Sequence, residues 1–150
     1  MTLTFRLARL DDPQSGALLR DYEAELRRQG IVQEGGWVGV EELVAPNGSF
    51  LIADLDGSAA ACGGVRRLDE AGIAEVKRMY VAPFARGRGV GAALLARLED
   101  EARALGCQLT RLDTGAGMEA ALALYRRAGY RQIADYNGNP HAAYWMEKKI

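Results

Sequence analysis

The sequence is poor in the residues on which metal-binding and disulfide-bonded proteins depend. Among its 150 residues there are two cysteines, Cys62 and Cys107, and one histidine, His141. The cysteines lack a CxxC spacing, and together with one histidine they are too few for a structural zinc site. We therefore expect no metal, and we expect both thiols to be buried and reduced in a cytoplasmic protein.

Long apolar runs and an excess of one charge are also missing. No stretch approaches 18 uncharged apolar residues, and the N-terminus lacks a basic region followed by an apolar one. Neither a membrane span nor a secretion signal is therefore expected. The 19 basic and 20 acidic side chains nearly cancel, whereas nucleic acids and anionic membranes attract a concentrated cationic face. A small-molecule enzyme or a binding module remains.

The chain has the length and the patterning of one α/β domain over residues 1–150. Asp56-Gly57 predicts a hairpin, and apolar residues at three- and four-residue steps predict helices. Helices are expected at residues 13–30, 89–105 and 118–128, and strands at residues 2–9, 49–55, 59–68, 73–81, 108–114, 130–134 and 143–148. Hairpins followed by β-α-β crossovers predict a mixed, mostly antiparallel sheet of about seven strands with helices on both faces.

A glycine-rich turn, Arg86-Gly-Arg-Gly-Val-Gly91, leads into the longest apolar helix pattern. Unpaired amides and the helix dipole favour an anion at such a helix start, and glycine lets a diphosphate approach the backbone. Arg86 and Arg88 add charged donors. The turn also satisfies a loose dinucleotide fingerprint, Gly87-x-Gly89-x-x-Ala92 followed by Asp113, which leaves a nicotinamide-dependent oxidoreductase as an alternative.

Two motifs resemble those of the GNAT superfamily of N-acetyltransferases. Arg86-x-x-Gly89-x-Gly91 is similar to its Gln/Arg-x-x-Gly-x-Gly/Ala signature, and the segment from Leu124 to Tyr130 is similar to its later helix motif. The resemblance implies the acyl-CoA N-acyltransferase fold, acetyl-CoA as co-substrate, and transfer of the acetyl group to a primary amine. It implies coenzyme contacts from Met79, Tyr80, Val81, Arg86, Gly87, Arg88, Gly89, Val90, Gly91 and Ala92.

Acetyl transfer to an amine needs a base, because an alkylammonium with a pKa near 10.4 is protonated at neutral pH. An interior strand should be nearly all apolar, yet residues 73–81 carry Glu75, Lys77 and Arg78. Glu75 is the candidate base, a role that a glutamate at this motif position commonly has in the superfamily. The alternative is that Glu75 only pairs with Lys77 or Arg78.

Tyr125 lies in an apolar helical stripe, a pattern that favours packing in the core. The resemblance places its phenol beside the coenzyme sulfur, where a group with a pKa near 10 can protonate the departing thiolate. Tyr125 is therefore the candidate acid. The oxyanion is expected to be stabilised by backbone N–H groups near Met79 to Val81, where the superfamily separates this strand from its parallel neighbour.

The acceptor pocket is expected between residues 29–42 and the turn at residues 136–141. Glu34, Trp37, Glu41 and Tyr136 are candidates to attract and stack a cationic amine of a small molecule. The alternative to an enzyme is a coenzyme-binding sensor or scaffold with no productive acceptor site. Exposed edges of the sheet also allow a homodimer.

Overall fold

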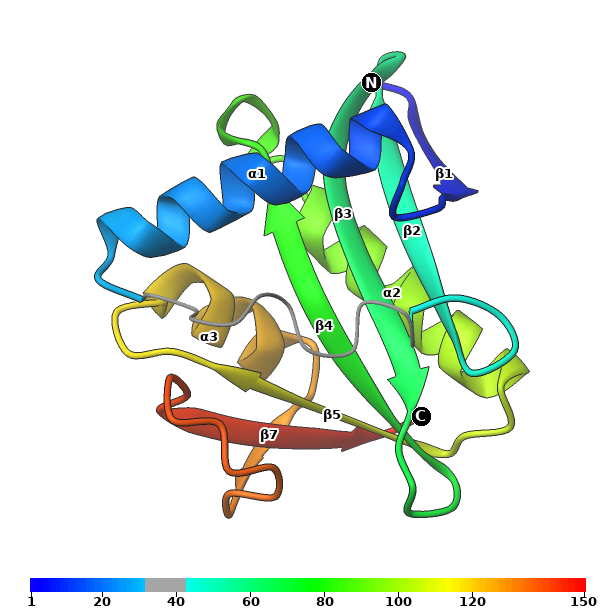
Figure 1. The fold of residues 1–150 in the computed structure, drawn as a ribbon, viewed down its shortest axis with the longest axis vertical. Helices are drawn as coiled ribbons and strands as arrows, with labels where there is room; N and C mark the ends of the chain where they lie inside the picture. Colours follow the sequence, from blue (N-terminus) through cyan, green and yellow to red (C-terminus); the bar gives the residue numbers. More distant parts are fainter. Residues whose placement is uncertain (32–42) are drawn as a thin grey trace.

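The computed structural model describes residues 1–31 and 43–150, which form one mixed sheet with helices packed against it (Figure 1). The strands are β1 (Leu3–Leu7), β2 (Gly48–Leu55), β3 (Ser58–Arg67), β4 (Ile73–Val81), β5 (Leu109–Thr114), β6 (Arg131–Ile133) and β7 (Tyr144–Lys149). The helices are α1 (Pro13–Arg28), α2 (Val90–Ala104) and α3 (Glu119–Arg127), with a short 3-10 turn η2 (Pro83–Ala85). The described strands are ordered β1-β2-β3-β4-β5-β7-β6.

The sheet is antiparallel except for one pair of strands. β2 and β3 form the expected hairpin, in which Asp56 and Gly57 both have positive φ, 50° and 85°. Two left-handed residues give the turn a twist that matches the twist of the flanking strands. Among the described strands only β4 and β5 run parallel, so the predicted mixed, mostly antiparallel sheet is confirmed.

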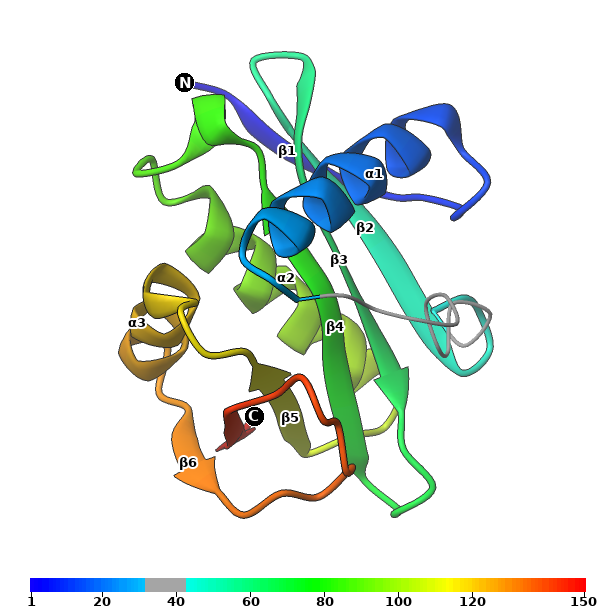
Figure 2. The same ribbon diagram turned by 60° about the vertical axis from the view of Figure 1, so that its left-hand side comes forward.

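Helices cover both faces of the sheet, as predicted. α1 begins at Pro13, and the side chain of Asp12 caps it by accepting a hydrogen bond from the amide of Gln14 at 2.8 Å. Because side chains alternate along a strand, Phe50 of β2 lies in the core cluster that contains Leu18 of α1, whereas its neighbour Leu51 lies in the cluster that contains residues of α2 and α3. The two views show α1 crossing one face while α2 runs along the other (Figures 1 and 2).

β4 leaves the neighbouring strand β5 after the first third of its length. The parallel pairing covers only Ile73 to Glu75, and the rest of β4 diverges from β5 (Figure 2). On its other side β4 has a β-bulge, where Arg78 and Met79 lie opposite the single residue Gly63 of β3. Arg78 has a φ of 59°, a left-handed conformation that is uncommon for residues other than glycine, asparagine and aspartate. The divergence and the bulge together open the middle of the sheet.

Candidate active site

The glycine-rich turn presents backbone donors at the start of α2. Gly87 and Gly89 have φ values of 74° and 78°, and a Cβ on either would meet nothing within 4 Å. Glycine is therefore required here for backbone conformation and not for space. Ala93 donates to the carbonyl of Gly89 at 3.1 Å, so the amides of the three residues between them precede the helical ladder. These amides are free to bind an anion.

A cleft of about 570 Å³, here called the turn cleft, lies between this turn, β4 and α3. Its lining contains nine of the residues expected to contact the coenzyme, namely Met79, Tyr80, Val81, Arg86, Gly87, Gly89, Val90, Gly91 and Ala92. Arg88 does not line it and is exposed to solvent. Amide donors at one end and apolar walls along the strand fit a ligand with a diphosphate and an extended arm.

Arg86 connects the turn to α1. Its Nε donates to the carbonyl of Val81 at 2.9 Å, and its Nη2 lies 2.5 Å from Oε2 of Glu25. The guanidinium also lies over the ring of Tyr80, 5.7 Å from the ring centre. The guanidinium of Arg86, which the sequence assigns to the diphosphate, is therefore also paired with the carboxylate of Glu25.

A second cavity of about 420 Å³, here called the gap pocket, occupies the space that opens where β4 leaves β5. Its charged and polar lining includes Arg66, Lys77, Arg78, Asp113, Asn137, Asn139 and His141. Part of this lining belongs to the turn at residues 136–141, where a wall was expected. The gap pocket and the turn cleft share five residues, which are Tyr22, Met79, Met118, Ala121 and Tyr125. The two cavities therefore adjoin each other along one wall.

Tyr125 projects from α3 into this shared wall. Its side chain is buried, and its ring meets that of Tyr130 edge to face with 6.0 Å between ring centres. Burial raises the pKa of Tyr125 well above its ordinary value, and the neighbouring Tyr22 and Asp113 add to the shift. The phenol therefore keeps its proton at neutral pH.

Glu75 lies behind the gap pocket with no exposed surface. Its Oε1 is bound by Arg66 at 3.0 Å and lies 3.6 Å from Nζ of Lys77. Its Oε2 accepts hydrogen bonds from the hydroxyl of Tyr136 at 2.6 Å and from Nδ2 of Asn137 at 3.2 Å. Glu75 thus pairs with Lys77, one of the partners expected from the sequence, and its oxygens reach the pocket only through these partners.

Tyr136 and Asp113 differ from their expected positions. Tyr136 does not line the gap pocket; it packs behind the wall, where burial and the charge of Glu75 raise its pKa. Asp113, which the sequence analysis names only in the dinucleotide fingerprint, does line the pocket and accepts a hydrogen bond from Lys77 at 3.3 Å. Its position at the end of β5, beside the diverging strand β4, is the feature of the sequence that could have predicted a place in the pocket. Nothing in the sequence predicted that Tyr22 and Met118 line both cavities, because they lie among the apolar residues of helical segments, where packing in the core is expected.

Glu34, Trp37 and Glu41 lie outside the described residues. Within residues 1–31 and 43–150, no three side chains of histidine, cysteine, aspartate or glutamate are grouped as metal ligands. No helix in the described part of the chain is long and apolar enough to cross a membrane.

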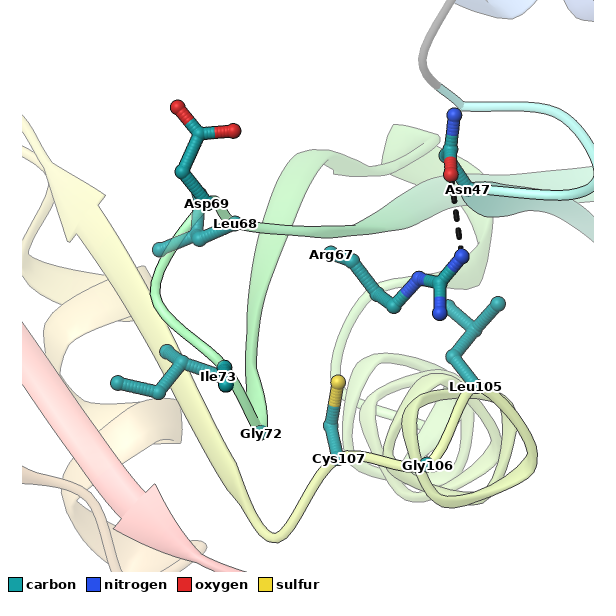
Figure 3. Close-up of a pocket in the computed structure, with 10 residues that line it drawn as sticks. Asn47, Arg67, Leu68, Asp69, Gly72, Ile73, Leu105, Gly106 and Cys107 are labelled. Atoms are coloured by element: carbon teal, nitrogen blue, oxygen red, sulfur yellow. Dashed lines mark hydrogen bonds between the residues drawn. The ribbon is translucent and has the colours of Figure 1, made fainter.

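A third cavity, of about 510 Å³, lies at the other end of the sheet and shares no residue with the first two. It is bordered by the turn between β3 and β4 and by the end of α2 (Figure 3). Arg67 crosses it to bind Oδ1 of Asn47 at 3.1 Å, and the thiol of Cys107 lies close by. Substitutions here serve as controls for the active-site wall.

Comparison with known proteins identifies the class of protein. The chain matches the acetyltransferase (GNAT) family over residues 10–130. It is 38% identical over 113 residues to an IAA acetyltransferase of Azospirillum brasilense, covering 74% of each chain. A solved Klebsiella pneumoniae protein described as an acyl-CoA N-acyltransferase is 32% identical and has a TM-score of 0.82, with 99% of this chain and 97% of that chain covered. A Thermoplasma acidophilum N-acetyltransferase solved with coenzyme A has 21% identity and a TM-score of 0.77, with both chains fully covered.

The chain therefore belongs to the GNAT family of acetyltransferases. It is an acyltransferase that depends on acetyl-CoA as co-substrate. The family match decides against the alternative of a nicotinamide-dependent oxidoreductase, whose fold is a doubly wound parallel sheet, and so does the sheet, in which only one pair of the described strands runs parallel. The resemblance of the two sequence motifs to those of the GNAT superfamily is thereby confirmed.

Proposed function

We propose that this protein transfers an acetyl group from acetyl-CoA to the primary amine of a small molecule by direct attack of the amine. The observation that carries this proposal is the wall shared by the turn cleft and the gap pocket, with Tyr125 and Met79 in it. A donor bound in one cavity and an acceptor bound in the other meet at that wall. Direct transfer needs such an arrangement, because the reacting atoms must approach within about 3.5 Å.

The donor is assigned to the turn cleft. The amides at the start of α2 bind its diphosphate, and the residues from Met79 to Val81 run alongside its arm in the way that an added strand does. Acetyl-CoA supplies a thioester, whose carbonyl carbon accepts the amine and whose thiolate leaves. The bulge at Arg78 and Met79 removes one residue from the regular pairing with β3, which supports a backbone N–H of this segment as the oxyanion donor.

Glu75 is assigned as the general base that removes the proton of the ammonium through a water molecule. Both oxygens of Glu75 are engaged by partners, and Lys77 and Asn137 connect it to Asp113. Asp113 is the carboxylate that lines the gap pocket, so a water bound there provides the path from the amine. Tyr125 is assigned as the acid that protonates the departing thiolate, because its phenol lies in the wall where the two cavities meet.

A small acceptor is supported by the size of the gap pocket. Its volume of about 420 Å³ lies in the range of small-molecule sites, which is roughly 300 to 1,000 Å³. We further propose that residues 1–150 form one domain. We also propose that the protein works in the reducing cytoplasm, where the free and buried thiols of Cys62 and Cys107 stay reduced. A homodimer is also predicted, and analytical ultracentrifugation measures whether the protein sediments as a monomer or as a dimer.

The test is thiol release by the purified protein, measured with acetyl-CoA and a panel of amines. We expect free thiol and acetylated amine to form in equal amounts with at least one small amine. Coenzyme A that binds and shifts the melting temperature, with no thiol released for any amine, would instead support the sensor or scaffold alternative.

A further inference from the structure

The described lining of the turn cleft includes the charged side chains of Glu25, Arg86, Glu119 and Arg127. Arg86 and Glu25 form an ion pair with each other, with 2.5 Å between Nη2 and Oε2. Arg127 lies in the last turn of α3 and is exposed to solvent. Within residues 1–31 and 43–150 its guanidinium makes no ion pair and no hydrogen bond. Arg127 is therefore a cation of the cleft whose donors are left for a ligand.

A basic residue in the last turn of a helix often serves the helix itself. Its charge is favourable at the negative end of the helix dipole, and its side chain can bind the last carbonyls. In α3 the backbone amides of residues 128–130 bind the carbonyls of residues 124–126, at 3.0 to 3.1 Å. The side chain of Arg127 is therefore not needed to cap the helix, and it lines the cleft instead.

The end of α3 that carries Arg127 lies close to the backbone amides at the start of α2. A Cβ on Gly91 would lie 3.3 Å from Cδ2 of Leu124, so the two helices touch at this point. Residues three apart in a helix share a face, and Arg127 follows Leu124 by about 4.5 Å along the axis. Both residues line the cleft. The long side chain of Arg127 therefore reaches a second anionic group close to a diphosphate held at these amides.

The same helix places Arg127 away from the reacting end of the cleft. Met118 and Ala121 lie in the wall shared with the gap pocket, whereas Arg127 lines the turn cleft alone. Arg127 follows Ala121 by six residues, which is about 9 Å along α3. With the thioester at the shared wall and the diphosphate at the start of α2, the adenosine end of coenzyme A extends beyond the turn. That end of the coenzyme carries a further phosphate, on the 3′-oxygen of the ribose.

We infer that Arg127 binds the 3′-phosphate of the coenzyme, and that the protein thereby selects coenzyme A over dephospho-coenzyme A. This inference rests on the proposed function, which assigns the donor to the turn cleft. A phosphate monoester carries up to two negative charges near neutral pH, and a guanidinium binds it with two parallel hydrogen bonds. Because the 3′-phosphate is remote from the thioester, its contact with Arg127 strengthens binding of the coenzyme and leaves the chemical step unchanged.

The experiment compares two coenzymes that differ only in the 3′-phosphate. Calorimetry measures the Kd of coenzyme A and of dephospho-coenzyme A, and we expect coenzyme A to bind at least about tenfold more tightly, as one hydrogen bond to a charged group provides. Raising the salt concentration should reduce this preference, because Arg127 is exposed. Thiol release with the two acetylated coenzymes should show the same preference in KM and an equal kcat, the pattern of a contact made equally in the ground state and the transition state.

Variants at Arg127 are chosen to keep α3 intact. Arg127→Gln removes the charge and has a similar helix propensity. It is expected to reduce the preference to less than about threefold by weakening coenzyme A alone, while the Kd of dephospho-coenzyme A stays unchanged. Arg127→Lys is expected to keep part of the preference, because it keeps the charge and loses the paired donors. Arg126→Gln is the matched control, since Arg126 is exposed in the same turn of α3 and does not line the cleft.

The outcomes separate the inference from the function on which it rests. Equal binding of the two coenzymes by the wild-type protein overturns the inference and leaves the proposed function in place. An unchanged preference in Arg127→Gln, or the same loss in Arg126→Gln, also overturns it. Thiol release with none of the amines contradicts the proposed function, whereas a preference for coenzyme A that Arg127→Gln removes still supports the inference. Absence of binding of both coenzymes contradicts the two together.

Discussion

The side chain of Asn137 bridges Glu75 and Asp113, since its Nδ2 donates to Oε2 of Glu75 at 3.2 Å and to Oδ2 of Asp113 at 2.5 Å. Oδ1 of Asn137 accepts a hydrogen bond from the indole of Trp145 at 2.9 Å, which fixes the direction of the amide. Lys77 also contacts both carboxylates. The buried carboxylate and the one in the gap pocket therefore form a single unit, to which the proposal assigns the proton of the ammonium.

Glu75→Gln is predicted to lower kcat/KM for the amine by about 100-fold near neutral pH, as loss of a general base does. The effect becomes smaller as the pH approaches the pKa of the amine, because free amine then needs no base. A pH profile of kcat/KM measures this. Glu70→Gln is the matched control, since Glu70 binds Arg111 at the exposed turn between β3 and β4.

Removing Glu75 also affects folding, because Arg66 loses a buried partner. The melting temperature of Glu75→Gln is expected to fall for this reason. Activity measured well below that temperature separates the two effects. A fall in kcat/KM of equal size at all pH values would contradict the role of Glu75 as base.

Tyr125→Phe is predicted to lower kcat by about 100-fold with little change in the KM for acetyl-CoA. Phenylalanine keeps the ring in the shared wall and removes only the proton donor. Burial raises the pKa of Tyr125, so the wild-type protein should show no loss of kcat from this group up to about pH 10, the ordinary pKa of a phenol. Steady-state kinetics from pH 7 to pH 10 measure both effects.

Tyr130→Phe provides the comparison for this variant. The hydroxyl of Tyr130 is also buried, and it bonds to Thr110 at 2.7 Å and Glu99 at 2.9 Å. Its removal is expected to reduce stability by about 1 kcal/mol or more and to leave kcat unchanged. Normal turnover by Tyr125→Phe would show that the thiolate leaves without help from this phenol.

Gly89→Ala is predicted to weaken coenzyme binding, and Gly89→Asp to abolish it. Gly89 has a positive φ and directly precedes the amides of the turn, so a side chain strains the turn, and an aspartate also repels the diphosphate. Gly57→Ala is the control, because Gly57 has a φ of 85° and free space around it in the β2–β3 hairpin. Both alanine variants should lose about 1 kcal/mol of stability, and only Gly89→Ala should lose the thermal shift given by coenzyme A.

Cys62 is predicted to make the free energy of unfolding fall at alkaline pH. Burial raises its pKa from 9.0 to about 12, while the charge of Arg78 opposes the shift. The unfolded thiol therefore loses its proton before the folded one does, so this stability is complete below pH 9 and is lost as the pH rises toward 12. Denaturant unfolding between pH 8 and pH 10.5 measures the slope. In Cys62→Ala the slope should be smaller, by up to 1.36 kcal/mol per pH unit; an equal slope contradicts the assignment.

Features that depend on neighbouring residues were predictable from the sequence. The Asp56-Gly57 hairpin, the cap at Asp12 and the glycine turn before α2 each follow from the conformations that those residues favour locally. The parting of β4 from β5 was expected only through the resemblance to the GNAT superfamily. The structure places its start at Glu75.

Features that depend on distant pairing were not predictable. Asn137 and Glu75 are 62 residues apart, and no spacing rule connects a loop asparagine with a strand glutamate. The left-handed conformation of Arg78 arises from the register of β4 against Gly63, and an arginine gives no sign of it in the sequence. Tyr136 was assigned to the pocket because aromatic residues bind cations, whereas its hydroxyl binds Glu75 behind the wall.

Calorimetry with coenzyme A tests most directly whether the turn from Arg86 to Gly91 binds the diphosphate of the coenzyme. We expect one binding event per chain for the wild-type protein and for Gly57→Ala, its loss in Gly89→Asp, and no comparable heat with NAD. Absence of heat with coenzyme A in the wild-type protein, or an unchanged affinity in Gly89→Asp, would contradict it.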